Sequence, residues 1–241
     1  MIEAAFWGAL GASALLAGAV IAYRFDVSRR TMAVIMAIGT GLLIGSVSFE
    51  LVDEALKTSE VLPVAVFVMV GAAAFTVGDW ILDHNGGAER VDSTGGQEQG
   101  QPLAIVLGSV LDGIPESFVL GLTVLTGSVS VSLLVAVLLS NLPEGMSASM
   151  GLRLAKWREW RVYRMWLVVV VVSAVSAAAG YVLLDPASGR NGAIVQAFAA
   201  GALLAMLADT LLPEAYAVEG VLTGPLVVVG FAVSIGLSSI S

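Results

Sequence analysis

The chain has 241 residues, of which 58% are hydrophobic and only 12% are charged, and its mean hydropathy is +0.93. These values lie outside the range of an ordinary soluble domain. A formal net charge of −8 argues against binding to nucleic acid. Because the sequence contains no cysteine, disulfides, thiolate metal sites and cysteine nucleophiles are excluded.

Long apolar stretches follow one another along the chain, and a helix needs ~20 such residues to cross a hydrocarbon core ~30 Å thick. We therefore expect eight transmembrane helices, at about 4–24, 31–55, 62–82, 102–126, 130–151, 165–184, 192–213 and 224–240. The first begins near an acid, Glu3, and is too long for the apolar part of a signal peptide. The predicted fold class is an all-α polytopic membrane protein, with residues 1–241 in a single transmembrane domain.

The basic residues predict the orientation of these helices. In the eight-helix arrangement, nine of the 11 Lys and Arg residues fall on one side: Arg24, Arg29, Arg30, Arg90, Arg153, Lys156, Arg158, Arg161 and Arg164. Lys57 and Arg190 fall on the other side. The positive-inside rule then places both termini outside the cytoplasm, in a cell (inner) membrane. Residues 84–101, rich in Gly, Gln and acids, are predicted to form a flexible cytoplasmic loop.

Carboxylates, but no Lys or Arg, lie deep within the predicted helices. Those near the middle of a helix are Asp112, Glu116 and Glu144, and those nearer the ends are Glu50, Asp53, Asp79, Asp209 and Glu214. An ionised acid at the centre of a membrane helix costs ~2.5–3.5 kcal/mol even on the lenient insertion scale. Such acids must be protonated, hydrated or bound to a cation.

The spacing of the central acids predicts a shared site. Asp112 and Glu116 are four residues apart and lie on one face of the fourth helix, and Ser140 and Glu144 repeat that spacing on the fifth. Counted from the expected turn at residues 127–131, Glu116 and Glu144 lie at similar depths of roughly 16 and 20 Å. Two carboxylates at that depth are suited to a divalent cation.

Each central glutamate follows a proline, Pro115 or Pro143. A proline inside a helix removes one backbone hydrogen bond and leaves the carbonyl four residues earlier without its donor. These carbonyls, at Leu111 and Leu139, can face a cavity or an ion. We therefore expect the fourth and fifth helices to be kinked around a central site, although prolines also kink membrane helices for packing alone.

The motifs around these prolines resemble those of the ZIP family of divalent metal transporters. Residues 140–145 (Ser-Asn-Leu-Pro-Glu-Gly) are close to the family's His/Gln-Asn-x-Pro-Glu-Gly signature, and residues 112–117 (Asp-Gly-Ile-Pro-Glu-Ser) are a more divergent copy. Residues 39–55 and 199–215 look like the second and seventh helices of that family. The resemblance covers most of the chain, and the short bacterial form without a large extracellular domain fits best.

The resemblance implies a metal site between the fourth and fifth helices, with one or two metals held by ligands from Asp112, Glu116, Ser140, Asn141 and Glu144. The family favours Zn²⁺ or Fe²⁺ as the transported substrate. This chain, however, has Asp112 and Ser140 where family members usually have histidine or glutamine. An all-oxygen site favours harder ions such as Mn²⁺, Mg²⁺ or Ca²⁺, so the identity of the metal is left open.

The acids near helix ends suggest a path for cations. Glu50, Asp53 and Glu54 end the second helix outside, Asp79, Asp83 and His84 end the third inside, and Glu214 ends the seventh inside; each is at least as well explained as a solvated or capping residue. Asp209, near the end of the seventh helix, is a further possible pathway residue. We expect no enzymatic activity, because a Gly-Lys-Ser/Thr phosphate loop and histidines in the membrane helices are lacking. The alternatives are a proton- or sodium-coupled carrier using the same acids and a non-transporting metal sensor. The expected partners are metal ions and the lipid bilayer, with a homodimer left open.

Overall fold

The computed structural model describes residues 1–82, 84, 102–125, 129–183 and 190–239. The predicted loop 84–101 falls outside these residues except for His84. Within the described part the chain is helical, with no strand. Its helices are α1 (Ile2–Arg24), α2 (Arg29–Val47), η1 (Ser48–Val52), α3 (Asp53–Thr58), α4 (Val61–Leu82), α5 (Pro102–Leu125), α6 (Val131–Leu154), α7 (Glu159–Leu183), α8 (Arg190–Met206), η5 (Leu207–Leu211), α9 (Leu212–Glu219), η6 (Gly220–Leu222) and α10 (Thr223–Ser238).

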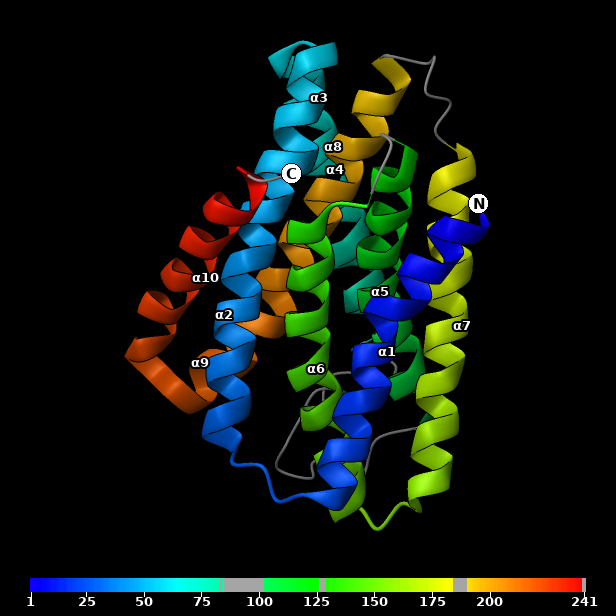
Figure 1. The fold of residues 1–241 in the computed structure, drawn as a ribbon, viewed down its shortest axis with the longest axis vertical. Helices are drawn as coiled ribbons and strands as arrows, with labels where there is room; N and C mark the ends of the chain where they lie inside the picture. Colours follow the sequence, from blue (N-terminus) through cyan, green and yellow to red (C-terminus); the bar gives the residue numbers. More distant parts are fainter. Residues whose placement is uncertain (83, 85–101, 126–128, 184–189, 240–241) are drawn as a thin grey trace.

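By length and hydropathy, seven segments of the described residues qualify as membrane spans, which establishes an all-helical, multi-pass character. The last of them, Asn191–Ser238, is 48 residues long and includes α8, α9 and α10. It is broken at Gly220, whose φ of +58° suits a residue without a Cβ. From there α10 runs back along α2, and its last turn lies toward the same end of the bundle as the start of α1 (Figure 1).

A π-helical turn lies within the long helix after α2 and within the one after α8. Each of these turns, η1 and η5, joins its neighbours into a continuous helix, α2–η1–α3 or α8–η5–α9, and each holds an acid, Glu50 or Asp209. A π turn adds a residue to the helix and is frequent at functional sites. The hydropathy pattern could not reveal these turns, because they leave the apolar stretch unbroken.

Glycines set the closest helix crossings, and they do so in reciprocal pairs. A Cβ on Gly41 of α2 would overlap the backbone of Val227 in α10, and one on Gly230 of α10 would overlap that of Ile38 in α2. The same mutual contact joins α4 to α8, α5 to α7 and α1 to α6, through Gly71 with Gly201, Gly121 with Gly180, and Gly18 with Gly145. In a membrane, where burial from water does not drive helices together, such close backbone packing is a main source of association.

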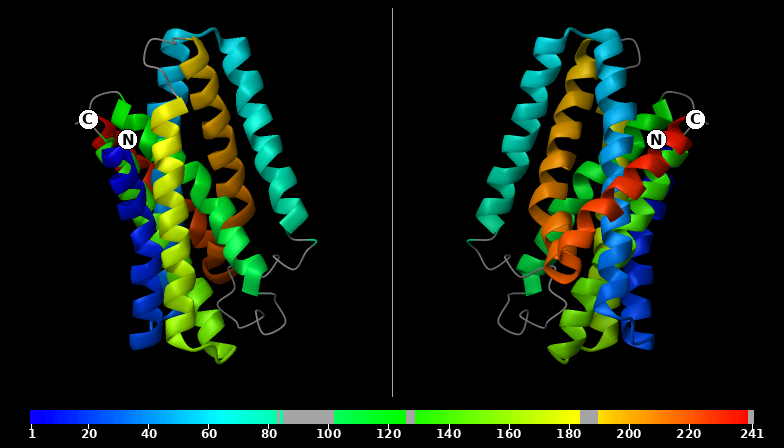
Figure 2. Two further views of the ribbon diagram at one scale, coloured as in Figure 1. Left: turned by 90° about the vertical axis from the view of Figure 1, so that its right-hand side faces the viewer. Right: turned by 90° about the vertical axis from the view of Figure 1, so that its left-hand side faces the viewer.

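These crossings divide the bundle into two groups of helices, one of α1, α5, α6 and α7 and the other of α2, α4, α8 and α10 (Figure 2). The groups meet mainly where α2 packs along α6, whereas α5 touches α8 over a much smaller surface. The interface has a core of small and aliphatic residues that includes Leu43, Leu120, Val137 and Leu203. The site described below lies at this interface.

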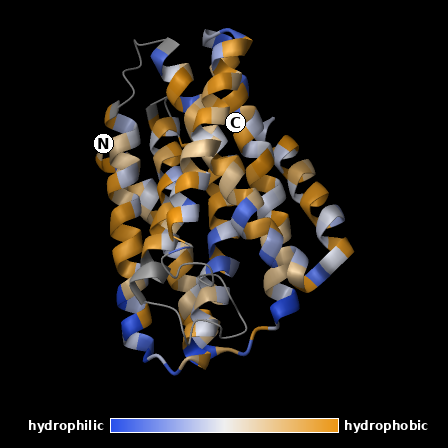
Figure 3. Ribbon diagram, turned by 180° about the vertical axis from the view of Figure 1, so that it is seen from behind, coloured by the Kyte–Doolittle hydropathy of each residue, from blue (hydrophilic) through white to orange (hydrophobic). Residues whose placement is uncertain are grey.

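Hydrophobic residues dominate the middle of the helices, and hydrophilic residues are concentrated at the turns (Figure 3). The helix that carries the predicted span 165–184 starts earlier than that span, because α7 begins at Glu159. Its first turn is charged and therefore invisible to a hydropathy argument, yet it is helical. Similarly, α9 continues the predicted span 192–213 to Glu219. Differences of this size arise because helices extend past the hydrocarbon core.

Candidate metal site between α5 and α6

The five residues implied as ligands are all buried in the structure. Asp112 and Glu116 on α5 and Ser140, Asn141 and Glu144 on α6 are each at most 3% exposed. Both helices remain α-helical across Pro115 and Pro143; the expected kinks stay predictions. The sequence provides no Lys or Arg on α5, and on α6 only Arg153 in the last turn. These five side chains are called the central layer below. Their burial needs an explanation other than pairing with a basic residue of α5 or α6.

One contact joins the two helices at the centre of this layer. The Ser140 hydroxyl lies 3.3 Å from Glu116 Oε1 and 3.1 Å from the Val137 carbonyl oxygen in its own helix, and can donate to either. The second carboxylate oxygen of Glu116, Oε2, is buried and accepts no hydrogen bond in the structure. A buried acceptor without a donor is costly unless a proton or a cation occupies it.

Asn141 lies beside Glu116 and also reaches α1. Its side-chain amide donates a hydrogen bond of 3.2 Å to the Gly11 carbonyl on α1. Next to it, the close crossing of Gly18 and Gly145 fixes α1 against α6. The structure thus gives Asn141 a role in holding α6 on α1, and its role as a metal ligand stays a prediction.

The three central acids share a layer without converging on one point. In the part of the chain that the structure describes, no group of three or more His, Cys, Asp or Glu side chains is placed to hold a metal ion. What the structure brings together is Glu116 with Ser140, while Asp112 lies one helical turn away on α5. The arrangement is therefore a pair of facing oxygen groups with further buried acids nearby.

The carbonyl of Leu139, which Pro143 leaves without its backbone donor, packs against α2. A Cβ on Gly39 of α2 would lie only 2.9 Å from the Leu139 carbonyl oxygen and 3.0 Å from the nitrogen of Ser140. Gly39 thus lets the backbone of α2 press directly against the site-bearing turn of α6. This contact was not foreseen from the sequence, although a glycine at a helix crossing is a general signal for close backbone approach.

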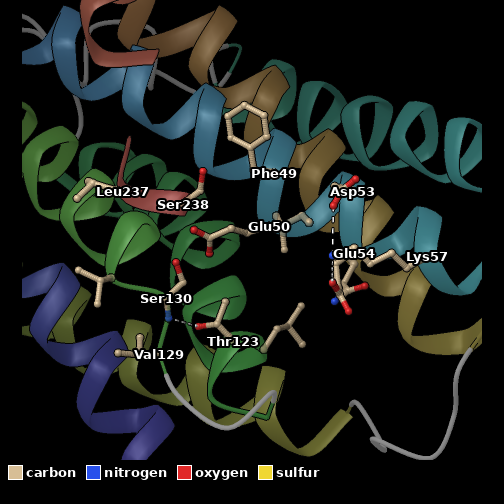
Figure 4. A pocket seen from close by; sticks show the side chains of 14 residues that line it. Phe49, Glu50, Asp53, Glu54, Lys57, Thr123, Val129, Ser130, Leu237 and Ser238 are labelled. Carbon is tan, nitrogen blue, oxygen red and sulfur yellow. Dashed lines mark hydrogen bonds and ion pairs between the residues drawn. The ribbon is translucent and has the colours of Figure 1, made fainter. Parts of the chain in front are cut away.

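A cavity of about 910 Å³ opens at the end of the bundle where η1 and α3 lie. Glu50 projects into it toward Ser130, above Thr123 (Figure 4). The Oε1 atom of Glu50 is buried and accepts no hydrogen bond in the structure. At the rim, Lys57 lies 3.2 Å from Asp53 and 2.9 Å from Glu54 in exposed ion pairs. Of the three acids predicted at the outer end, Glu50 lies inside the cavity, whereas Asp53 and Glu54 lie at its rim and are paired with Lys57.

The cavity does not reach the central layer. Thr123, at its floor, is seven residues from Glu116 on α5, which corresponds to roughly 10 Å along the helix. Beside the cavity, the α2–α6 contact includes a buried hydrogen bond of 2.8 Å between the hydroxyls of Ser46 and Ser132. The aliphatic side chains of Leu120 and Val137 belong to the core packed in this region. The central acids are thus closed off from the cavity.

On the opposite side of the layer, α6 contacts α9. Ser147, one turn after Glu144, donates a hydrogen bond of 2.9 Å to Glu214. Both residues line a small cavity of about 10 Å³ together with Arg29. The structure therefore connects the predicted Glu214 to the helix that carries Glu144, through a serine that the sequence reasoning did not single out.

The remaining pathway residues lie away from the central layer. Asp209, in η5, is exposed and accepts a hydrogen bond of 3.5 Å from Thr76 of α4. Asp79, half-buried, is one turn further along α4. His84 stacks against Trp80, with ring centroids 4.2 Å apart. The bond from Thr76 joins α4 to η5, and the structure does not bring these residues to Glu116.

Neither the protein-family models nor the curated proteins with which the chain was compared match it. A fold of packed helices can serve many functions, so the function must be argued from the residues of the site. The residues that carry such an argument are the buried carboxylates of α5 and α6, and above all Glu116 with its unbonded oxygen.

Proposed function

We propose that the protein transports divalent metal ions across the membrane, as the ZIP family does, through a site between α5 and α6. The observation that carries this proposal is the buried Glu116, which meets Ser140 across the two helices and keeps one carboxylate oxygen without a hydrogen bond. In a helix of a membrane protein, an intramembrane acid in this state marks an ion or proton pathway by default.

A dication is the occupant that best offsets the cost of burying these groups. Glu116, Asp112 and Glu144 are at most 3% exposed, and together they bring formal negative charge into one layer. A divalent ion with oxygen ligands compensates more than one such charge, which a single proton does not. A bound ion would draw Glu116 and Glu144 toward each other, with Ser140 adding a neutral oxygen ligand.

The topology proposed for this function has eight crossings, with α8–α9 and α10 counted separately. It is supported by the break at Gly220 and by α10 running beside α2. The exposed basic residues near the α1–α2 and α6–α7 turns support a cytoplasmic location for that end. The cavity with Glu50 then faces outward, and metal moves from it toward Glu214 and the cytoplasm.

The closed central layer, with cavities of unequal size on its two sides, supports a carrier over an open channel. A cavity of about 910 Å³ approaches it from the Glu50 side, while the cavity at Glu214 holds about 10 Å³. Transporters that bind at mid-membrane expose their site to one side at a time by moving one group of helices against another. The contact of α2 with α6, centred on Gly39, is the surface on which such a movement would act.

A proton- or sodium-coupled carrier is the second candidate. It is favoured by the finding that, within the described residues, no three acidic or imidazole groups converge as metal ligands. A single carboxylate such as Glu116 suffices for the binding of a proton. The two candidates differ in whether a divalent ion itself crosses the membrane.

The test is uptake of radioactive Zn²⁺ and Mn²⁺ into proteoliposomes by the wild type, Glu116→Gln and Glu60→Gln. Glutamine keeps the size of Glu116 and its contact with Ser140 but removes the charge, so uptake should fall to the level of vesicles without protein. Glu60 is exposed in the turn before α4, so its neutral variant should transport normally. Undiminished uptake by Glu116→Gln would refute the site, and wild-type vesicles that move protons or sodium but no metal would favour the second candidate.

A further inference from the structure

Four cations crowd the turn between α6 and α7. Within the nine residues from 156 to 164 the chain carries Lys156, Arg158, Arg161 and Arg164, all of them exposed. The only acid in this stretch, Glu159, faces Arg24 at 3.9 Å and Tyr163 at 3.4 Å. Among the described residues, no carboxylate lies within ion-pair distance of any of these four cations.

The other cations at this end of the bundle are mostly paired within the protein. Arg30 lies 3.0 Å from Glu219, and Arg153 lies 3.2 Å from Asp26 while also donating to the Ala22 carbonyl. These contacts tie the α1–α2 turn to α9 and α6. The four cations of the α6–α7 turn are therefore free of ion pairs with the described residues, whereas Arg30 and Arg153 are held by internal contacts.

The exposed face of α7 fixes where this charge lies in a membrane. Leu167, Val168, Val171 and Val175 are exposed along it, each by more than half of its surface. From Arg164 to the end of α7 at Leu183 there are 19 residues, or roughly 28 Å, close to the ~30 Å of a hydrocarbon core. When this apolar face spans the core, Arg161 and Arg164 lie at the level of the lipid phosphates.

An aromatic side chain completes the surface. Trp160 is 64% exposed, and the guanidinium of Arg164 lies over its ring at 5.4 Å from the centroid. Tryptophan is favoured at the membrane interface, where its ring is half in apolar surroundings and half in water. Arginine presents a planar set of donors that matches two phosphate oxygens. Arg161 is three residues before Arg164, so the two side chains are neighbours on one face of the helix.

We propose that the α6–α7 turn binds the headgroup of an anionic phospholipid, with its phosphate held by Arg161 and Arg164 and its neck against Trp160. The occupant is a membrane lipid, because the surface continues directly into the lipid-facing stripe of α7. Arg158 and Lys156 add attraction for the negative charge of the surrounding leaflet. This lipid site is separate from the buried carboxylates of α5 and α6, and it holds whether or not these transport metal.

The test is native mass spectrometry of the purified full chain with phosphatidylglycerol and phosphatidylcholine added in equal amounts. We expect the wild type to retain phosphatidylglycerol preferentially, and Arg161→Gln with Arg164→Gln to lower its affinity by about tenfold or more. The matched control is Arg24→Gln with Arg30→Gln, which removes the same charge at the same end but from cations that are already paired. It should lower the affinity by less than about threefold.

Equal losses in the two double variants would show diffuse charge attraction and overturn the site, as would a wild type without preference. A second measurement leaves all the arginines in place. Lipids brominated near the headgroup should quench Trp160, measured as the difference between wild type and Trp160→Phe, more strongly with phosphatidylglycerol than with phosphatidylcholine. Equal quenching by the two lipids would also overturn the proposal.

Discussion

Two groups of acids in this protein differ in what they find around them. At the cavity rim, Asp53 and Glu54 are exposed and share the ammonium group of Lys57. In the central layer, Glu116 is 1% exposed and meets the hydroxyl of Ser140, with Oε2 left without a donor. At the rim, water and Lys57 stabilise the charged carboxylates. In the central layer a proton or a cation is needed to offset the cost of burial. A carboxylate is therefore inexpensive at the exposed rim and costly in the buried central layer, unless an ion or a proton binds it.

The largest effect should come from removing the central acids. Glu116→Ala with Glu144→Ala deletes two buried anionic groups, and metal uptake into proteoliposomes should fall to background while the protein still inserts. The matched variant, Asp53→Asn with Glu54→Gln, removes two rim acids and should keep most of the uptake. If the rim variant loses uptake and the central variant keeps it at equal abundance, the difference in role between the two groups is reversed.

A second prediction concerns the side of the membrane to which the rim belongs. The chain has no cysteine, so single cysteines at Glu60 and Glu159, both exposed, can be labelled without background. In intact cells whose outer envelope admits the reagent, an impermeant thiol reagent should label Glu60→Cys and spare Glu159→Cys, by about tenfold or more, because the basic turns face the cytoplasm. The opposite pattern would place the rim and Glu50 at the exit instead of the entrance.

A third, smaller effect should appear in metal preference. Asp112→His with Ser140→His adds two nitrogen ligands beside Glu116, and equilibrium competition on purified protein should shift toward Zn²⁺ over Mn²⁺ by about tenfold. Wild type and variant must first show equal helical content, because imidazole is bulkier than either group it replaces. An unchanged ranking of the two metals would mean that these positions do not set selectivity.

The smallest effect is expected at Lys57. Lys57→Ala releases Asp53 and Glu54 from their ion pairs, which are exposed and therefore weak. The apparent affinity for metal, taken from the concentration dependence of uptake, should change by no more than about fivefold. Abolished uptake would show that the rim is not a passive solvated surface but part of the site.

Much of the architecture could be predicted from local sequence. Stretches of apolar residues at about the length of a membrane crossing gave the positions of α1, α4, α5 and α6 to within a few residues. The spacing of Asp112, Glu116, Ser140 and Glu144 indicated which residues share the buried layer. Both inferences work because the cost of burying backbone and charge in lipid is large and depends on short segments.

The tertiary structure decided the contacts between segments that lie far apart in the chain. The reciprocal glycine crossings, Gly39 against the Leu139 carbonyl, Asn141 bonded to Gly11 and Ser147 bonded to Glu214 all join residues on different helices. A sequence shows that a glycine or serine is available but not which helix will lie opposite. The sequence by itself thus determined that the chain is helical and apolar enough to cross a membrane several times, and which helices bury acids, because these depend on short segments. Only the packing of helix on helix decided which oxygen atoms face each other and from which side they can be reached.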